Sequence, residues 1–153
     1  ATTGPTSSER PPADGPVEHP IGATRIDHVV VLAPDVDRLA TALAEVGLEP
    51  RRTRRTDTYG FPARQVFYRL GEAILEVVGA DDPTAGPPGA DPEQPSRFFG
   101  LALTVADLDA AVARLAPHVG RAKPAVQEGR RIATLRHRDV HMSVALALMS
   151  PEP

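Results

Sequence analysis

Cysteine is absent from the 153 residues, and so is tryptophan. Without cysteine the chain has no disulfides, no thiolate metal ligands and no cysteine nucleophile. Aromatic residues make up only 4% of the chain, and the formal net charge is −3. Proteins that bind nucleic acids usually carry a basic excess and stacking aromatics. We therefore expect no nucleic-acid partner.

Long hydrophobic runs are also missing. No apolar stretch approaches the roughly 20 residues that a membrane span needs, and the N-terminus has no hydrophobic signal core. Together with the lack of cysteine, this favours a cytoplasmic protein that does not contact membranes. The apolar fraction of 41% allows one domain with a core, or two small fused modules.

Proline is the residue in excess, with 17 copies, five of them in the first 20 residues and five between Pro83 and Pro95. The first cluster predicts a flexible arm over residues 1–23, because the segment has no apolar periodicity. The second predicts a linker over residues 80–97. These segments leave two modules, at residues 24–79 and 98–150.

The first module opens with a β-branched run, Ile26–Leu32, which predicts a strand. Side chains alternate along a strand, so one face is expected to carry Ile26, His28, Val30 and Leu32. Asp35 is placed to cap a helix, and Gly47 to end it in the left-handed conformation. Between them, apolar residues recur at helical spacing, at Val36, Leu39, Ala40, Leu43 and Val46.

A polar strand is expected over Leu48–Thr56, and it contains four arginines: Arg51, Arg52, Arg54 and Arg55. Two interpretations are open. Charge protects an edge strand against pairing with another chain, and charge runs are usually solvated. Alternatively, the arginines form a mouth for an anionic substrate.

A hairpin follows, with strands Gln65–Leu70 and Ala73–Val78 around a two-residue turn at Gly71-Glu72. Such a turn sets the register, which places Phe67 opposite Glu76. One face then carries Gln65, Phe67, Arg69 and Glu76, and the apolar face that packs on the helix carries Val66, Tyr68, Leu70, Leu75 and Val77. Glu76 needs a partner there, because an unpaired buried carboxylate is costly. In the preceding loop, Tyr59 and Phe61 either form a lid or simply pack.

The same order of elements returns 72 residues later. A strand over Phe98–Val105 precedes a capping Asp107 and a helix containing Leu108 and Leu115, and a hairpin is expected over Gly129–Arg136 and Val140–Leu148. An internal repeat of this kind indicates two related units that share a core. The predicted fold is α+β: two tandem βαβββ modules whose curved sheets form a cup, with the helices outside.

These residues resemble the vicinal oxygen chelate superfamily, which includes glyoxalase I, bleomycin-resistance proteins, methylmalonyl-CoA epimerases and extradiol dioxygenases. The resemblance covers about residues 26–150. The motifs that carry it are Ile26-Asp27-His28-Val29-Val30-Val31 with Asp35-Val36-Asp37, Ala73-Ile74-Leu75-Glu76-Val77-Val78, and Leu101-Ala102-Leu103-Thr104-Val105 with Asp107-Leu108-Asp109.

The resemblance implies a divalent metal (Zn, Ni, Mn or Fe) held by one ligand from the first and one from the last strand of each module. His28 and Glu76 match these positions in the first module, but His28 corresponds to Gly100 in the second. The counterpart of Glu76 falls at Ser143, Ala145 or Ala147, none of them a usual ligand. His141, expected on the same strand face, and ligands from a partner chain are possible replacements, since the resemblance also implies a homodimer.

Two functions are open. The first is a metal-assisted isomerase, lyase or dioxygenase acting on a small organic molecule through His28 and Glu76. The second is a non-catalytic ligand-binding or drug-sequestering protein without metal, in which the two side chains satisfy each other. Arg69 either binds a substrate carboxylate or pairs with Glu76. The residues expected to contact a ligand are Gln65, Phe67, Arg69, His141 and Tyr59.

Overall fold

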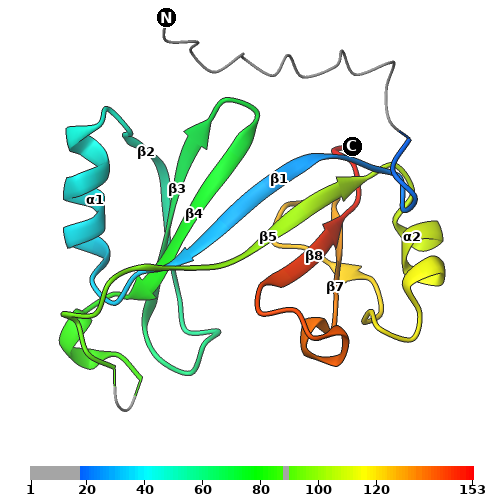
Figure 1. The fold of residues 1–153 in the computed structure, drawn as a ribbon. Coiled ribbons are helices and arrows are strands. Elements are labelled where there is room, and N and C mark those ends of the chain that lie inside the picture. Colours follow the sequence, from blue (N-terminus) through cyan, green and yellow to red (C-terminus); the bar gives the residue numbers. More distant parts are fainter. Residues whose placement is uncertain (1–17, 88–89) are drawn as a thin grey trace, which may run out of the picture.

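The computed structural model describes residues 18–87 and 90–153; most of the predicted arm, residues 1–17, lies outside this range. In the first half, a strand and a helix are followed by three strands (Figure 1): β1 Ala23–Leu32, α1 Val36–Glu45, β2 Pro50–Thr56, β3 Ala63–Leu70 and β4 Ala73–Ala80. The second half repeats this order with β5 Arg97–Val105, α2 Leu108–Leu115, β6 Lys123–Pro124, β7 Arg131–Thr134 and β8 Ala145–Met149.

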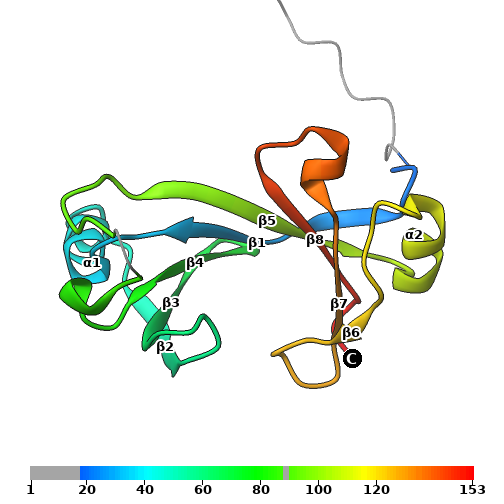
Figure 2. The ribbon, with the colours of Figure 1, turned by 90° about the horizontal axis from the view of Figure 1, so that it is seen from below.

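All eight strands belong to one sheet, in the order β2-β3-β4-β1-β5-β8-β7-β6. In each half the first strand lies parallel to the last, β1 beside β4 and β5 beside β8. The antiparallel pairing of β1 with β5 joins the halves. Strands β2 and β3 extend to the same side of β1 and β5 as β6 and β7 do, and the helices lie at the two outer ends (Figure 2). The predicted α+β fold of two βαβββ units is confirmed.

The local signals for helices and turns also hold. The Asp35 carboxylate accepts a hydrogen bond from the Arg38 backbone N–H at 2.9 Å, and Asp107 accepts one from that of Ala110 at 3.0 Å. Gly47 has a φ of 80°, as a left-handed helix end requires. In the hairpin, Leu70 lies opposite Ala73, so the two-residue turn sets the predicted register.

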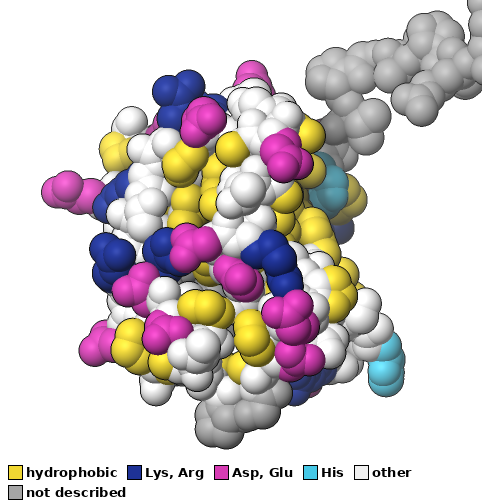
Figure 3. Space-filling model, turned by 90° about the vertical axis from the view of Figure 1, so that its left-hand side faces the viewer, with side chains coloured by type: hydrophobic (Ala, Val, Ile, Leu, Met, Phe, Trp, Pro, Cys, Tyr) yellow, Lys and Arg dark blue, Asp and Glu magenta, His cyan; other side chains and the backbone are white. Residues whose placement is uncertain are grey.

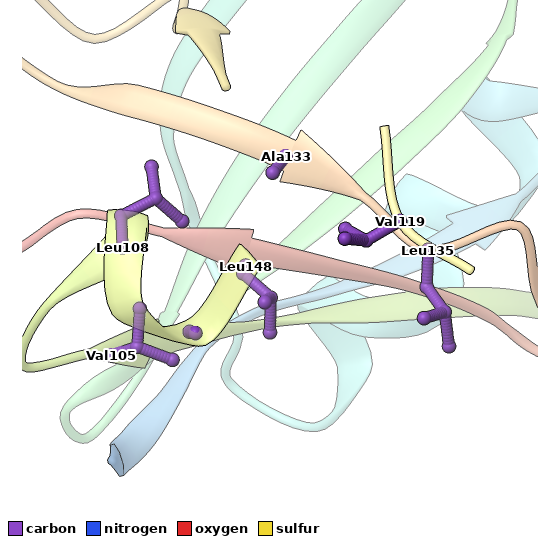
Figure 4. Packing of buried hydrophobic residues seen from close by; sticks show 7 residues of the cluster. Val105, Leu108, Val119, Ala133, Leu135 and Leu148 are labelled. Carbon is purple, nitrogen blue, oxygen red and sulfur yellow. The ribbon is translucent and has the colours of Figure 1, made fainter. Parts of the chain in front are cut away.

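Each helix packs on its own half of the sheet through a separate apolar cluster. Under α1 the buried members are Ala33, Val36, Val66, Tyr68 and Val77. The α2 cluster is drawn in Figure 4 and comprises Val105, Leu108, Ala111, Val119, Ala133, Leu135 and Leu148. Leu70, predicted to join the first cluster, is instead 40% exposed at the hairpin tip.

The closing hairpin departs from the prediction. Strand β8 begins only at Ala145, because residues 137–140 form a 3-10 turn. His141 follows this turn with a left-handed φ of 57° and is exposed. Its expected place on a strand face with Ala145 and Ala147 is therefore wrong.

The start of the first strand also differs from the prediction. β1 begins at Ala23, three residues before the predicted strand start and within the predicted arm.

The segment predicted as a linker is fixed to α1. It contains a short 3-10 turn, Pro83–Ala85, and the Arg38 guanidinium donates to the backbone oxygens of Pro92 and Gln94 at 2.7 and 2.8 Å. On this side of the molecule acidic and basic side chains are interspersed among apolar ones (Figure 3). Within residues 18–87 and 90–153, no helix is long and apolar enough to cross a membrane.

Candidate functional site

His28 and Glu76 come together in the first half of the sheet. The parallel pairing of β1 with β4 places Val30 beside Glu76, one alternate position from His28. The imidazole Nε2 lies 3.8 Å from the carboxylate Oε2, and the side chains are only 14% and 13% exposed. This separation is too long for a hydrogen bond but short enough for each charge to affect the other.

Gln65 fixes the other oxygen of Glu76. The register of β3 and β4 places both on one face, and the Gln65 amide donates to Oε1 at 2.7 Å. The same amide nitrogen lies 3.3 Å from the Tyr59 hydroxyl, and Arg54 donates to the Gln65 carbonyl oxygen at 3.3 Å. Burial raises the pKa of Glu76 above its ordinary value, although the charges of His28 and Arg54 and the Gln65 hydrogen bond oppose this.

Asp27 fixes the proton on His28. The imidazole Nδ1 and the Asp27 carboxylate are 2.9 Å apart, so Nδ1 carries the proton that the carboxylate accepts, and Nε2 is the nitrogen that faces Glu76. Adjacent strand residues normally point to opposite faces. Here Ile26 pairs with Leu103 but His28 with Ala102, so β1 has a bulge with Asp27 as the extra residue.

Asp27 in turn depends on the second half of the chain. Its carboxylate, 4% exposed, contacts the Arg130 guanidinium at 2.6 Å and accepts from the Thr104 hydroxyl at 3.0 Å. Burial alone would raise the pKa of Asp27, but hydrogen bonds from His28, Arg130 and Thr104 outweigh it and hold the pKa well below its ordinary value.

Sequence reasoning missed both Asp27 and Arg130. The regular alternation of β1 placed Asp27 away from His28 and left Ile26 beside it, whereas Ile26 is 48% exposed. The available signal was the carboxylate itself, since an Asp within a buried strand requires a cationic or hydrogen-bonding partner.

The register identifies the second-half counterparts of the pair. Val29 lies opposite Leu101, the residue to which it corresponds when the first half is shifted by 72 residues. The same shift places Gly100 at the position of His28. Just as Val30 lies beside Glu76, Ala102 lies beside Ala147. Of the three positions considered for the counterpart of Glu76, the structure selects Ala147.

Gly100 has no room for a side chain. A Cβ there would lie 2.3 Å from the Ala145 backbone oxygen, so a histidine does not fit unless the backbone moves. Ala147 offers no donor atom, which leaves His28 and Glu76 as two donors, whereas catalytic zinc sites use three protein ligands. Among the described residues no group of three or more His, Cys, Asp or Glu side chains is arranged to hold a metal. The donor set of one chain does not fit a resident catalytic metal.

The remaining predicted ligand contacts divide into two groups. Phe67 and Arg69 lie on the Glu76 face of the sheet, and Tyr59 is linked to it through Gln65. Arg69 makes no hydrogen bond or ion pair with Glu76. His141 lies outside the strands, so the strand face on which its inclusion depended is absent.

Two cavities are lined by residues next to the pair in the sheet, although neither is lined by His28 or Glu76. A mostly apolar cavity of about 790 Å³ begins at Val30 and Val78, the neighbours of Glu76 toward the linker. Tyr59 and Phe61 also line it, with ring centroids 6.3 Å apart. A second cavity of about 390 Å³ lies toward the hairpin end. It is lined by Arg51, Arg52, Arg54, Phe67, Tyr68, Arg69, Ile74, Val126 and Gln127.

Comparisons with known proteins agree with this architecture. Residues 10–149 match the family described as "Glyoxalase-like domain". Among solved structures, methylmalonyl-CoA epimerase from Mycobacterium tuberculosis is 21% identical with a TM-score of 0.66, covering 86% of this chain and 91% of that one. A variant of the Streptomyces coelicolor epimerase in complex with 2-nitronate-propionyl-CoA is 24% identical with a TM-score of 0.64, covering 86% and 99%. No curated protein matches the sequence.

Proposed function

The chain belongs to the glyoxalase-like domain family, within the vicinal oxygen chelate superfamily, and we propose that it binds a small carbonyl compound and moves a proton on it with Glu76 and His28. The observation that carries the proposal is a largely buried carboxylate, fixed by Gln65, that faces Nε2 of an imidazole whose Nδ1 is held by Asp27. Such a pair is suited to proton transfer next to a carbonyl group.

Glu76 is the base that removes the proton. Its raised pKa brings it closer to neutral pH, where a general base is most effective. Gln65 occupies Oε1, so Oε2 is the oxygen available to a ligand. The nearby Tyr59 hydroxyl, whose pKa is raised by burial and by the Glu76 charge, remains protonated and can donate to a carbonyl oxygen.

His28 is the second proton carrier. Asp27 accepts the Nδ1–H, which orients the ring, presents Nε2 to the ligand and stabilises the imidazolium that forms when Nε2 takes a proton. In this way Arg130 and Thr104, which hold Asp27, support His28 without contacting the ligand.

The distance between the two groups restricts the reaction. Two bases that act on opposite faces of one carbon each need a contact of about 3 Å to it, so they lie roughly 6 Å apart. Nε2 and Oε2 are 3.8 Å apart, so both atoms would contact the same face of a ligand. This favours a same-face proton shift between neighbouring atoms over inversion by two opposed bases.

The solved relatives supply the first substrate to test. Methylmalonyl-CoA epimerases share this fold, and methylmalonyl-CoA has an acidic C–H beside a carbonyl group. Identities of 21% and 24% support the fold and leave the substrate open. The panel should therefore include α-hydroxy aldehydes, which suit a same-face shift.

Hydrogen exchange tests the proposal. Chelator-treated protein incubated with each compound in D₂O is expected to incorporate deuterium at the carbon beside the carbonyl, measured by mass spectrometry. Glu76→Gln is expected to slow exchange by about 10²- to 10⁴-fold. Glu72→Gln, in the exposed turn of the same hairpin, is the matched control and should exchange at the parent rate. Exchange that is as fast in Glu76→Gln as in the parent would disprove the role of Glu76.

A non-catalytic binding protein is the second candidate. The apolar cavity of about 790 Å³ beside the pair favours it, because it is large enough for a drug-sized ligand. This candidate predicts tight binding with no deuterium incorporation, and equal affinity in the parent and Glu76→Gln proteins.

A further inference from the structure

The polarity of the ligand-facing side of the first half changes across the sheet, from the edge strand β2 toward β1. Arg52 lies level with Phe67, Glu76 and Val30, and Arg54 lies level with Gln65 and Val78, whereas Arg69 lies one alternate position nearer the hairpin. From β2 to β1 the sheet spans three strand spacings, roughly 14 Å at about 4.8 Å each. A ligand lying over Glu76 therefore meets cations on one side and an apolar surface on the other.

The arginines divide between the two faces of β2. Arg52 pairs with Phe67 and Arg54 with Gln65, so both lie on the Glu76 face. Arg55, on the other face, binds Asp81 at 2.8 Å. β2 is at the edge of the sheet, and protection of that edge accounts for its charge. Edge protection does not account for Arg52 and Arg69, which lie on the Glu76 face of the sheet.

Those cations make no ion pair with any acidic side chain that the structure describes, although the charge of Arg54 acts on Glu76. Among the described residues, Arg52 and Arg69 make no ion pair, and Arg54 donates only to the neutral Gln65. They line the cavity of about 390 Å³ together with Phe67 and with Val126 and Gln127, which approach from the second half. Guanidinium groups around a partly apolar hollow suit a carboxylate or phosphate attached to an organic body.

The opposite cavity suits the other end of such a molecule. It is lined by Val30, Leu32, Val78, Ala80, Phe61 and Phe99, among others. Val30 and Val78 also flank Glu76, so the apolar surface continues from the proton-transfer pair into the cavity.

We propose that the ligand is an elongated organic anion whose charged end lies on Arg52, Arg54 and Arg69, whose apolar end fills the larger cavity, and whose middle lies over Glu76. This rests on the proposed function only in placing the ligand at Glu76. It adds that the reactive carbon lies between an anionic end and an apolar end.

Equilibrium binding of a fluorescent probe, dansyl-undecanoic acid, tests the inference against its uncharged methyl ester. The acid is expected to bind at least about 10-fold more tightly than the ester. In the Arg52→Gln/Arg69→Gln protein this preference should disappear through a loss on the order of 10- to 100-fold for the acid alone. Arg55→Gln, on the opposite face of the same strand, is the matched control and should leave both affinities unchanged.

Phe99→Ser examines the apolar end. Phe99 is 42% exposed, so the fold is expected to tolerate the change, and acid and ester should both bind about 10-fold more weakly. Equal binding of acid and ester, no binding of the acid, or an equal loss in Arg55→Gln would each overturn the inference. Charge-selective binding without deuterium exchange would keep this inference and overturn the proposed function, and exchange without charge selectivity would do the reverse.

Discussion

The two halves of the sheet share a scaffold but differ at the ligand-facing positions. Asp35 and Asp107 cap the helices in the same way. Two residues further on, Asp37 binds Arg64 of β3 at 2.8 Å and Asp109 binds Arg131 of β7 at 2.9 Å. The interactions that attach each helix to its strands are therefore repeated.

The chemistry is not repeated. His28 and Glu76 in the first half correspond to Gly100 and Ala147 in the second. The second half instead supplies Arg130 and Thr104, which hold Asp27 and through it His28. In this comparison, the second half supplies the support for the proposed site in the first.

The largest effect is expected from breaking that support. Arg130→Met removes the nearer cation from the buried Asp27 carboxylate and leaves it with the Thr104 hydroxyl and the more distant Arg25 guanidinium, 3.9 Å away. Removing one partner of a buried pair typically costs about 3–5 kcal/mol. Urea denaturation measures the loss. The Asp27→Leu/Arg130→Met double variant should recover much of it, because no uncompensated charge remains. A loss below about 1 kcal/mol in Arg130→Met would show that the halves are not coupled through this pair.

A second prediction addresses why the second half lacks a ligand at Gly100. Gly100→Ala forces a Cβ against the Ala145 backbone oxygen and is expected to lower the free energy of unfolding by about 1–3 kcal/mol. Gly120→Ala is the control, since the nearest atom to its Cβ is 3.5 Å away, and its stability should be near that of the parent. Equal stabilities for the two variants would refute the steric explanation.

A third prediction concerns the cost of Glu76 itself. Burial raises the pKa of Glu76, so the ionised carboxylate is less favourable in the folded protein than in the unfolded chain. The free energy of unfolding therefore falls as pH rises from the ordinary glutamate pKa of about 4.3 through the raised value. Glu76→Gln should therefore be more stable than the parent at neutral pH and similar to it below about pH 4. Thermal denaturation across this range is the measurement. A less stable variant at neutral pH would mean that interactions with His28 and Gln65 outweigh burial.

The smallest effect is expected at the repeated ion pairs. Arg131 and Asp109 are exposed, so Arg131→Gln should not change stability measurably. Arg64 is only 16% exposed and also lies 3.4 Å from Asp81, so Arg64→Gln should lower the melting temperature more. If Arg131→Gln were the more harmful change, the ranking of these pairs by burial would be wrong.

Much of the fold could be predicted because its signals are local. The capping aspartates, the left-handed Gly47 and the two-residue turn at Gly71-Glu72 each act within a few residues, and the turn placed Glu76 on the face away from the helix. The association of Glu76 with His28 came from the family resemblance. The bulge at Asp27 could not be predicted in this way. It depends on how β1 pairs with β5 across about 75 residues, and one extra residue reverses the face of every side chain before it.

The second half was harder for the same reason. Apolar residues from Val140 to Leu148 predicted one continuous strand, but residues 137–140 form a turn and only Ala145–Met149 pair with β5 and β7. Arg130 carries no local signal at all, since its partner Asp27 lies 103 residues away.

The approach of Ala145 to Gly100 also constrains how this protein can change in the future. Introducing a histidine at residue 100 and a carboxylate at residue 147 takes two substitutions, and the first is opposed by the backbone of β8. A four-ligand centre would therefore require a destabilising substitution unless β8 shifted beforehand. New activities are accordingly expected to arise from changes around His28 and Glu76.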